Sequence, residues 1–276
     1  MKQTYLTALM DRFDTFLLDQ FGVLLDGAKA YPDAPEALAE LSRRGKTVGI
    51  LTNSGKRAGP NADRLEAMGF DPAHIDAVVS SGEAARAVLS GMIGNSIAKS
   101  APVLVLSRGG DISCIQGLEL TPTEDPAIAE FVLIAGSRGE DLSLNHYADL
   151  LKGPATSGIP ALCTNPDMTM LTERGPAFGA GRIAQLYREL GGQVDEVGKP
   201  HPLIYQVAIE CLGATDPGNV LCVGDSPAHD IRGAHGAGCM AALVRTGIHV
   251  DEPLNQVLAD APPGDLPDFV IPGFAI

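Results

Sequence analysis

The stretch Asp19-Gln-Phe-Gly-Val-Leu-Leu-Asp-Gly27 begins directly after the apolar run Phe16-Leu-Leu18. The apolar run predicts a buried strand, which would place Asp19 at the carboxyl end of that strand. In open α/β sheets, ligands bind beyond the carboxyl ends of the strands, and a carboxylate has no packing role there. An aspartate can also cap an ordinary turn, so this segment alone leaves both interpretations open.

Three later segments repeat this arrangement of an apolar or β-prone stretch followed by small polar or charged residues. They are Ile50-Leu-Thr-Asn-Ser54, Glu196-Val-Gly-Lys-Pro200 and Leu221-Cys-Val-Gly-Asp-Ser226. We expect these four strand ends to face one crevice. Carboxylates gathered in one place raise each other's pKa unless a cation balances them, and Lys199 supplies that cation.

Strand-like and helix-like segments alternate along the first third of the chain, which predicts a parallel sheet with helices on both sides. The expected strands are 15–18, 47–51 and 75–79, and the expected helices are 34–43, 61–68 and 82–92. A Gly- and Ser-rich passage at 91–100 leads to a new set of short strands at 103–106, 131–135 and 161–164. Gly175-Pro-Ala-Phe-Gly179 is typical of a hinge, and the alternation resumes from Arg182.

The predicted fold class is therefore α/β, with a doubly wound, Rossmann-like parallel sheet as its core. Residues 1–90 and 180–276 form this discontinuous core, and residues 91–179 form an inserted α/β domain. An insertion of roughly 90 residues lies within the usual size range of a small domain.

Composition excludes several classes of partner. The net charge of −14 argues against binding to a nucleic-acid backbone, which needs clustered Lys and Arg. No apolar run approaches the roughly 18 residues of a membrane span, and the first residues lack a signal-like apolar core. We predict a soluble cytoplasmic protein without nucleic-acid or membrane partners. The five cysteines are odd in number and widely spaced, which indicates neither a disulfide framework nor a zinc site.

Asp19, Thr52, Lys199 and the pair Asp225 and Asp230 resemble, in order and spacing, the four signature motifs of the haloacid dehalogenase superfamily. The segments 198–205 and 224–231 are similar to those of its class IIA phosphatases, a group that includes nitrophenyl, phosphoglycolate and pyridoxal phosphatases. The resemblance spans nearly the whole chain. It implies that the inserted domain is a cap over the active site, and that a homodimer through the cap is one assembly to expect.

The resemblance also implies a role for each motif. Asp19 would attack phosphorus and form an aspartyl-phosphate. The hydroxyl of Thr52, the backbone amides of Asn53 and Ser54, and the ammonium of Lys199 would bind the phosphate.

The resemblance implies Mg²⁺ as the cofactor. Asp19, Asp225 and Asp230, the last directly or through water, would hold the ion together with the backbone carbonyl of residue 21. A carbonyl ligand does not depend on the side chain that accompanies it. Phe21 therefore keeps this predicted metal ligand.

Phe21 is also the main departure from the family pattern. Phosphatases of the family carry a second aspartate at this position, which protonates the leaving group and then activates water. Such acid and base catalysis is worth about 10² to 10⁴ in rate, or roughly 3 to 5 kcal/mol of barrier. We predict a slow or specialised magnesium-dependent phosphatase that acts on a small phosphorylated metabolite of the sugar or aryl phosphate class.

Alternatives remain open at this point. In one alternative, Asp26 or His229 replaces the missing aspartate as the general acid. In another, the leaving group of the substrate needs little protonation. The main rival is a catalytically impaired phosphate-binding, metal-binding or interaction protein on the same fold. A weaker one is dinucleotide binding, because Gly179-Ala-Gly-Arg-Ile-Ala184 matches a Gly-x-Gly-x-x-Ala fingerprint. That motif should directly follow a buried strand, and Glu173-Arg-Gly-Pro176 precedes it instead.

Overall fold

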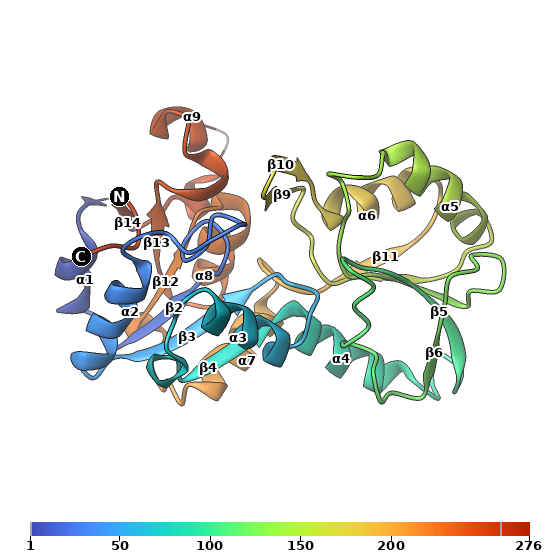
Figure 1. Ribbon diagram of the computed structural model, residues 1–276, viewed down its shortest axis with the longest axis horizontal. Coiled ribbons are helices and arrows are strands. Elements are labelled where there is room, and N and C mark those ends of the chain that lie inside the picture. Colours follow the sequence, from blue (N-terminus) through green and yellow to red (C-terminus); the bar gives the residue numbers. More distant parts are fainter. Residues whose placement is uncertain (1, 260) are drawn as a thin grey trace.

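The computed structural model describes residues 2–259 and 261–276 and has two parts (Figure 1). We call the larger part the core. It contains a seven-stranded, fully parallel sheet in the order β1-β14-β13-β12-β2-β3-β4. Its strands are β1 (Lys2–Gln3), β2 (Thr15–Leu18), β3 (Thr47–Thr52), β4 (Ala77–Ser80), β12 (Val220–Gly224), β13 (Met240–Val244) and β14 (Phe269–Ile271). This arrangement confirms the predicted α/β class with a parallel core sheet.

Helices cover both faces of the core sheet, because successive side chains of a strand point to opposite faces. In β2, Phe16 and Leu18 pack with α1 (Leu6–Met10), α2 (Ala34–Arg43) and α3 (Ala58–Ala67). Leu17 points the other way and packs with α7 (Pro202–Cys211) and α8 (Arg232–Gly236). The short helix α9 (Leu254–Val257) lies at the edge of this second layer. Short single-turn helices occupy Pro72–His74, Pro217–Asn219, Gly247–His249 and Pro263–Asp265, and a π-helix occupies Pro227–Ile231.

The second part, which we call the cap, is built on a five-stranded parallel sheet in the order β11-β8-β7-β5-β6. Its strands are β5 (Ala101–Leu106), β6 (Leu120–Thr123), β7 (Phe131–Ile134), β8 (Ala161–Cys163) and β11 (Val194–Glu196). One face packs against α5 (Leu144–Thr156) and α6 (Ala180–Glu189), and the other packs against α4 (Ser81–Met92).

The packing corrects the expected boundaries of the insertion. We expected residues 91–179, but Ala85 and Leu89 of α4 pack under the cap sheet, and Ile183 and Tyr187 of α6 pack on top of it. Strand β11 pairs with β8 of the cap. The amphipathic pattern of a helix shows that it covers a sheet but not which sheet. The chain therefore returns to the core after β11 and not at residue 180.

The expected hinge at 175–179 is also wrong, because Gly175–Phe178 is strand β10 of an antiparallel hairpin with β9 (Thr169–Thr172). The hairpin projects from the cap toward the core (Figure 1). It contacts the single turn at Gly247–His249. It also passes so near the turn at Gly27 that a Cβ there would lie 3.1 Å from the Leu171 carbonyl carbon.

No helix within residues 2–259 and 261–276 has the length and apolar character that crossing a membrane requires.

Candidate active site

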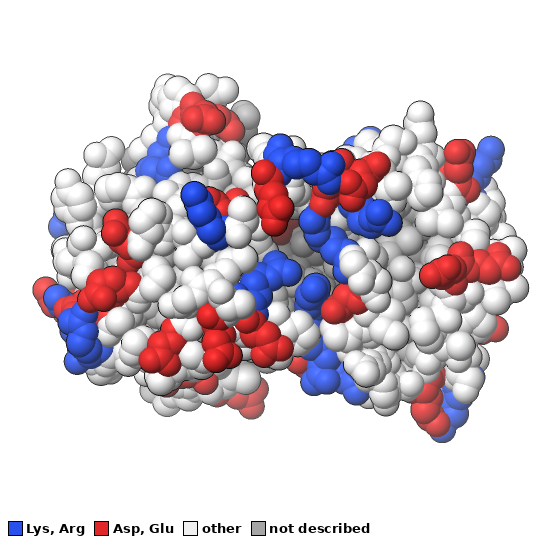
Figure 2. Space-filling model, in the orientation of Figure 1, with Lys and Arg blue, Asp and Glu red and all other residues white. Residues whose placement is uncertain are grey.

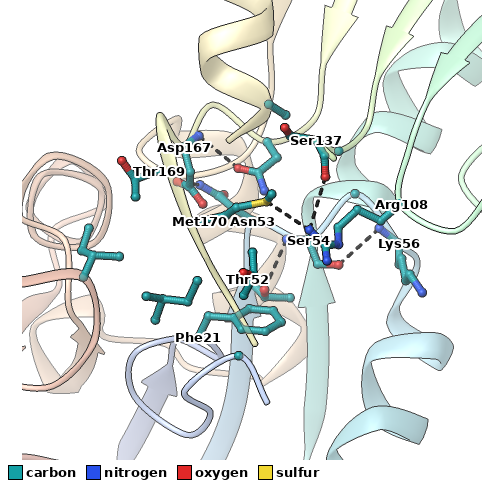
Figure 3. A pocket seen from close by; sticks show the side chains of 18 of the residues that line it. Phe21, Thr52, Asn53, Ser54, Lys56, Arg108, Ser137, Asp167, Thr169 and Met170 are labelled. Carbon is teal, nitrogen blue, oxygen red and sulfur yellow. Dashed lines mark hydrogen bonds between the residues drawn. The ribbon is translucent and has the colours of Figure 1, made fainter. Parts of the chain in front are cut away.

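The predicted site residues meet at the carboxyl edge of the core sheet. Asp19 follows β2, Thr52 ends β3 and Asp225 follows β12, and these three strands are neighbours in the sheet. They form the floor of a cavity of about 540 Å³ between core and cap. Figure 2 shows this hollow at the junction of the two parts, and Figure 3 shows its wall. All the predicted site residues line it: Asp19, Phe21, Thr52, Asn53, Ser54, Lys199, Asp225 and Asp230.

Lys199 lies between two carboxylates on this floor. Its Nζ is 2.8 Å from Asp19 Oδ1 and 2.6 Å from Asp230 Oδ1. The Lys199 side chain is only 3% exposed, so its ammonium is an internal charge that the two carboxylates stabilise. Asp230 also accepts a hydrogen bond from the Ser226 amide on Oδ2 at 3.0 Å. Both oxygens of Asp230 thus have protein donors, which favours a role in holding Lys199 in place.

The protonation equilibria reflect the crowding of these groups. Burial raises the pKa of Asp19 to about 7, with Lys199 opposing the rise and the Asp230 charge adding to it. Burial also raises the pKa of Asp225 well above its ordinary value, and the neighbouring carboxylates reinforce the shift. Burial would lower the pKa of Lys199, but attraction by Asp19 and Asp230 outweighs it and raises that pKa. The single positive charge of Lys199 therefore does not balance the three neighbouring carboxylates of Asp19, Asp225 and Asp230.

Two glycines pack the backbone against Asp225. Gly22 has φ of +85° and Gly247 has φ of +80°, and a Cβ on either would lie 2.0 or 1.9 Å from Asp225 Oδ2. The amide of Ile248 donates to the same oxygen at 2.9 Å. The absence of a Cβ at Gly22 and Gly247 thus admits the Asp225 carboxylate beside the turn that carries Phe21.

The donor set fits a magnesium ion. Asp19, Asp225 and Asp230 each offer a carboxylate oxygen, and these atoms all lie within 4.8 Å of one another. Magnesium prefers hard oxygen ligands and keeps several waters, so a few carboxylates facing an open cavity are sufficient. A divalent cation would also balance the excess negative charge described above.

Asn53 has a structural role that the sequence analysis missed. Its Oδ1 accepts hydrogen bonds from the Lys199 amide at 2.6 Å and from Ser81 Oγ at 3.1 Å. Its Nδ2 donates to Asp167 Oδ1 at 2.8 Å and to the Lys199 carbonyl at 3.1 Å. The side chain therefore joins β3, the loop that carries Lys199, and the cap, as Figure 3 shows for the bond to Asp167.

The turn at residues 52–54, which we predict to bind phosphate, contains a hydrogen bond of its own. Thr52 is 1% exposed, and its Oγ1 accepts a hydrogen bond from the Ser54 amide at 3.2 Å. The predicted binding of phosphate by Thr52 and by the amides of Asn53 and Ser54 stays a prediction.

The two candidate substitute acids differ in position. Asp26 accepts hydrogen bonds from the amides of Ala28 and Lys29 at 3.0 and 2.9 Å, so it closes a turn and does not line the cavity. His229 does line the cavity, and its Nδ1 is 3.2 Å from Asp167 Oδ1. Asp167 belongs to the segment Thr164-Asn-Pro-Asp167, which connects β8 to the hairpin strand β9.

The glycines of the dinucleotide-like motif have a packing explanation. A Cβ on Gly179 would lie 2.1 Å from the Asp167 carbonyl oxygen, and one on Gly181 would lie 2.0 Å from that of Pro166. The start of α6 therefore lies directly against the loop that carries Asp167. The motif follows a hairpin strand and not a buried parallel strand, so the dinucleotide interpretation is not supported.

Comparison with known proteins agrees with this fold and site. A model described as haloacid dehalogenase-like hydrolase matches residues 16–121, and a related HAD-like hydrolase model matches residues 196–275. Chronophin of Bos taurus is 29% identical over 284 residues, which cover 97% of this chain and 93% of that protein.

Two further similar proteins indicate the same family. The 5′-nucleotidase YutF of Bacillus subtilis (strain 168) is 30% identical over 244 residues, covering 87% of this chain and 90% of that protein. A haloacid dehalogenase-like hydrolase from Brucella suis 1330 superposes with a TM-score of 0.83 at 24% identity, with 98% of each chain covered. This chain therefore belongs to the haloacid dehalogenase-like hydrolase family. Within that family it falls among the class IIA phosphatases, which are phosphoric monoester hydrolases.

Proposed function

We propose that the protein is a magnesium-dependent phosphatase of small phosphate monoesters that works through an aspartyl-phosphate at Asp19. One observation carries the proposal: the Asp19 carboxylate lies 2.8 Å from the buried Lys199 ammonium, at the floor of a cavity that it shares with Asp225 and Asp230. A binding protein has no need of a carboxylate oriented in this way.

In the proposed reaction, a carboxylate oxygen of Asp19 attacks phosphorus, and the bond from phosphorus to the ester oxygen breaks. Water then attacks the acyl-phosphate, which releases inorganic phosphate and regenerates the carboxylate. Lys199 and the Thr52 hydroxyl hold the phosphate oxygens and stabilise the charge that develops on them. Magnesium, when bound by Asp19, Asp225, the Phe21 carbonyl and, directly or through water, Asp230, would supply Lewis-acid stabilisation of that charge.

Phe21 limits which substrates react well. A phenyl side chain donates no proton, so an alkoxide would have to leave with little assistance from this position. Leaving groups that are stable as anions, such as aryl oxygens, need less assistance. The cavity of about 540 Å³ also fits a small metabolite. We therefore propose a specialised phosphatase of sugar or aryl phosphates.

The test is phosphate release from a panel of sugar, glycolytic, nucleotide and aryl phosphates with magnesium present. Asp19→Asn is the blank, because an amide cannot form the acyl-phosphate in the same way. We expect release by the wild type that disappears in the variant. Phosphate release by the wild type that does not exceed the release by Asp19→Asn for any substrate would favour a binding protein without catalysis.

That rival is a phosphate- or metal-binding protein that has lost catalysis, and Phe21 at the acid position is the observation that favours it. It predicts binding of magnesium and phosphate without turnover. A homodimer through the cap and a cytoplasmic location remain predictions for this chain, which size-exclusion chromatography and cell fractionation would test.

A further inference from the structure

Arg64 lies in the active-site cavity beside the residue that replaces the family's acid. It belongs to α3, which begins shortly after the turn formed by Thr52 and Ser54. Its Cζ is 5.4 Å from the centroid of the Phe21 ring, and both residues line the cavity. A guanidinium at this distance from an aromatic ring makes a cation–π contact. The contact fixes the direction of the Arg64 side chain at the wall of the cavity.

The Arg64 guanidinium has no ionic partner within residues 2–259 and 261–276. Its surroundings disfavour its charge: burial lowers the pKa of Arg64, and the like charge of Arg108 lowers it further. Arg108 comes from the cap and pairs with the Glu140 carboxylate, so its own charge is compensated. Figure 3 shows Arg108 directed toward Met170 and Ser137 across the cavity from Phe21. Arg64 thus remains a partly buried cation that lies beside the Phe21 ring and has no carboxylate partner among the described residues.

Phe21 explains why this charge is free. The family pattern has a carboxylate at position 21, whereas this chain carries no negative charge there. The phenyl ring supplies a flat surface for the guanidinium and no negative charge. The same substitution that removes the acid therefore leaves a cation available at the edge of the site.

We propose that Arg64, held over Phe21, binds a second anionic group of the substrate, so that the site selects phosphate monoesters that also carry a carboxylate or a second phosphate. This inference rests on the proposed phosphatase function and specifies its substrate class. A planar guanidinium binds either group through paired hydrogen bonds, and the two sources are separated by experiment.

The experiment measures binding calorimetrically with unreactive phosphonates and magnesium present, so it does not depend on turnover. Phosphonoacetate is compared with 2-hydroxyethylphosphonate, and propane-1,3-bisphosphonate with propylphosphonate. Each pair differs in the second anionic group. The proteins are the wild type, Arg64→Met, Arg64→Lys and Arg12→Met. Arg12 is a matched control because its guanidinium also lies over an aromatic ring, 4.7 Å from the Phe269 centroid, and it does not line the cavity.

We expect the wild type to bind one or both doubly anionic ligands about tenfold or more tightly than the matched ligand, as charge-assisted hydrogen bonds allow. The pair with the larger ratio identifies the second group as carboxylate or phosphate. Arg64→Met should bring the ratio close to one, whereas Arg64→Lys keeps part of it and Arg12→Met keeps all of it.

A wild type without preference in either pair, or an Arg64→Met variant with the wild-type ratio, would overturn the inference. Where Arg64→Met unfolds at a lower temperature than the wild type, Arg64→Lys decides, because a ratio in that variant equal to the wild-type ratio would overturn the inference. Failure of the phosphatase proposal gives a different result, namely a preserved ratio without release of phosphate from any ester. Phosphate release with no effect of Arg64 on the ratio would leave the function standing and remove only this inference.

Discussion

The side-chain amide of Asn53 donates a hydrogen bond to the carboxylate of Asp167 at 2.8 Å, and this bond joins the core to the cap at the active site. Because Asn53 also holds the loop of Lys199 through hydrogen bonds at 2.6 and 3.1 Å, cap position and lysine position are linked. The position of the cap over the cavity is thus coupled to the residues on its floor.

Asp167→Ala should weaken catalysis by loosening this junction. The variant removes one acceptor from Asn53 and one of the partners of His229. The loss of a hydrogen bond of about 0.5 to 1.5 kcal/mol predicts roughly a twofold to tenfold drop in kcat/KM. Steady-state phosphate release measures it. Asp195→Ala is the matched control, since Asp195 is exposed on the edge strand β11. Equal values for the two variants would show that the junction has no part in catalysis.

Lys199→Met should destabilise the fold because it leaves buried carboxylates without their cation. Breaking a buried ion pair by removing one partner costs about 3 to 5 kcal/mol. The free energy of unfolding in urea, measured without magnesium, is the readout. Lys46→Met is the control, because Lys46 pairs at 3.1 Å with Asp14, whose side chain is 75% exposed. Such surface pairs are worth at most about 1 kcal/mol. Comparable losses in both variants would contradict the charge balance described for the site.

Magnesium should stabilise the folded protein, and Asp225→Asn should abolish most of that effect. A ligand at about 100 times its dissociation constant adds about 2.7 kcal/mol to the free energy of unfolding. The unfolding temperature with magnesium and with a chelator gives the comparison, and it needs no turnover. Asp251→Asn, at an exposed position, should respond as the wild type does. A response of Asp225→Asn equal to that of Asp251→Asn would place the metal elsewhere.

Phe21→Asp should raise the turnover of alkyl phosphates if the missing acid is what limits an otherwise competent site. Acid and base catalysis predicts a gain of about tenfold or more, while aryl phosphates should change little. Phe21→Leu is the control for loss of the ring without gain of a carboxylate. Absence of a gain would contradict this expectation and indicate that the pocket has been rebuilt around Phe21.

The sequence predicted that the strand ends of the site lie together, and the reason is local. Asp19, Thr52 and Asp225 each follow or end an apolar strand, and parallel strands bring their carboxyl ends to one edge without further information. Gly22, directly after Phe21, has φ of +85°, which lies in the left-handed region that favours glycine.

The sequence did not predict features that depend on contacts between the two parts of the molecule. The amphipathic pattern of α6 gave no sign that Ile183 and Tyr187 face the cap sheet. The bonds from Asn53 to Asp167 and the contact of Arg64 with Phe21 join residues far apart in the chain, and neither type of pair leaves a spacing signal. The Gly and Pro residues of 175–179 predict a hinge, whereas Gly175–Phe178 forms strand β10 of the β9–β10 hairpin.

A single-turnover reaction with an aryl phosphate and magnesium, stopped with acid, tests the covalent role of Asp19. Peptide mass spectrometry should then find a phosphoryl group on the peptide that carries Asp19 in the wild type and no such adduct in Asp19→Asn. Phosphate release that continues undiminished in Asp19→Asn, or a phosphoryl group trapped on another residue, would contradict it.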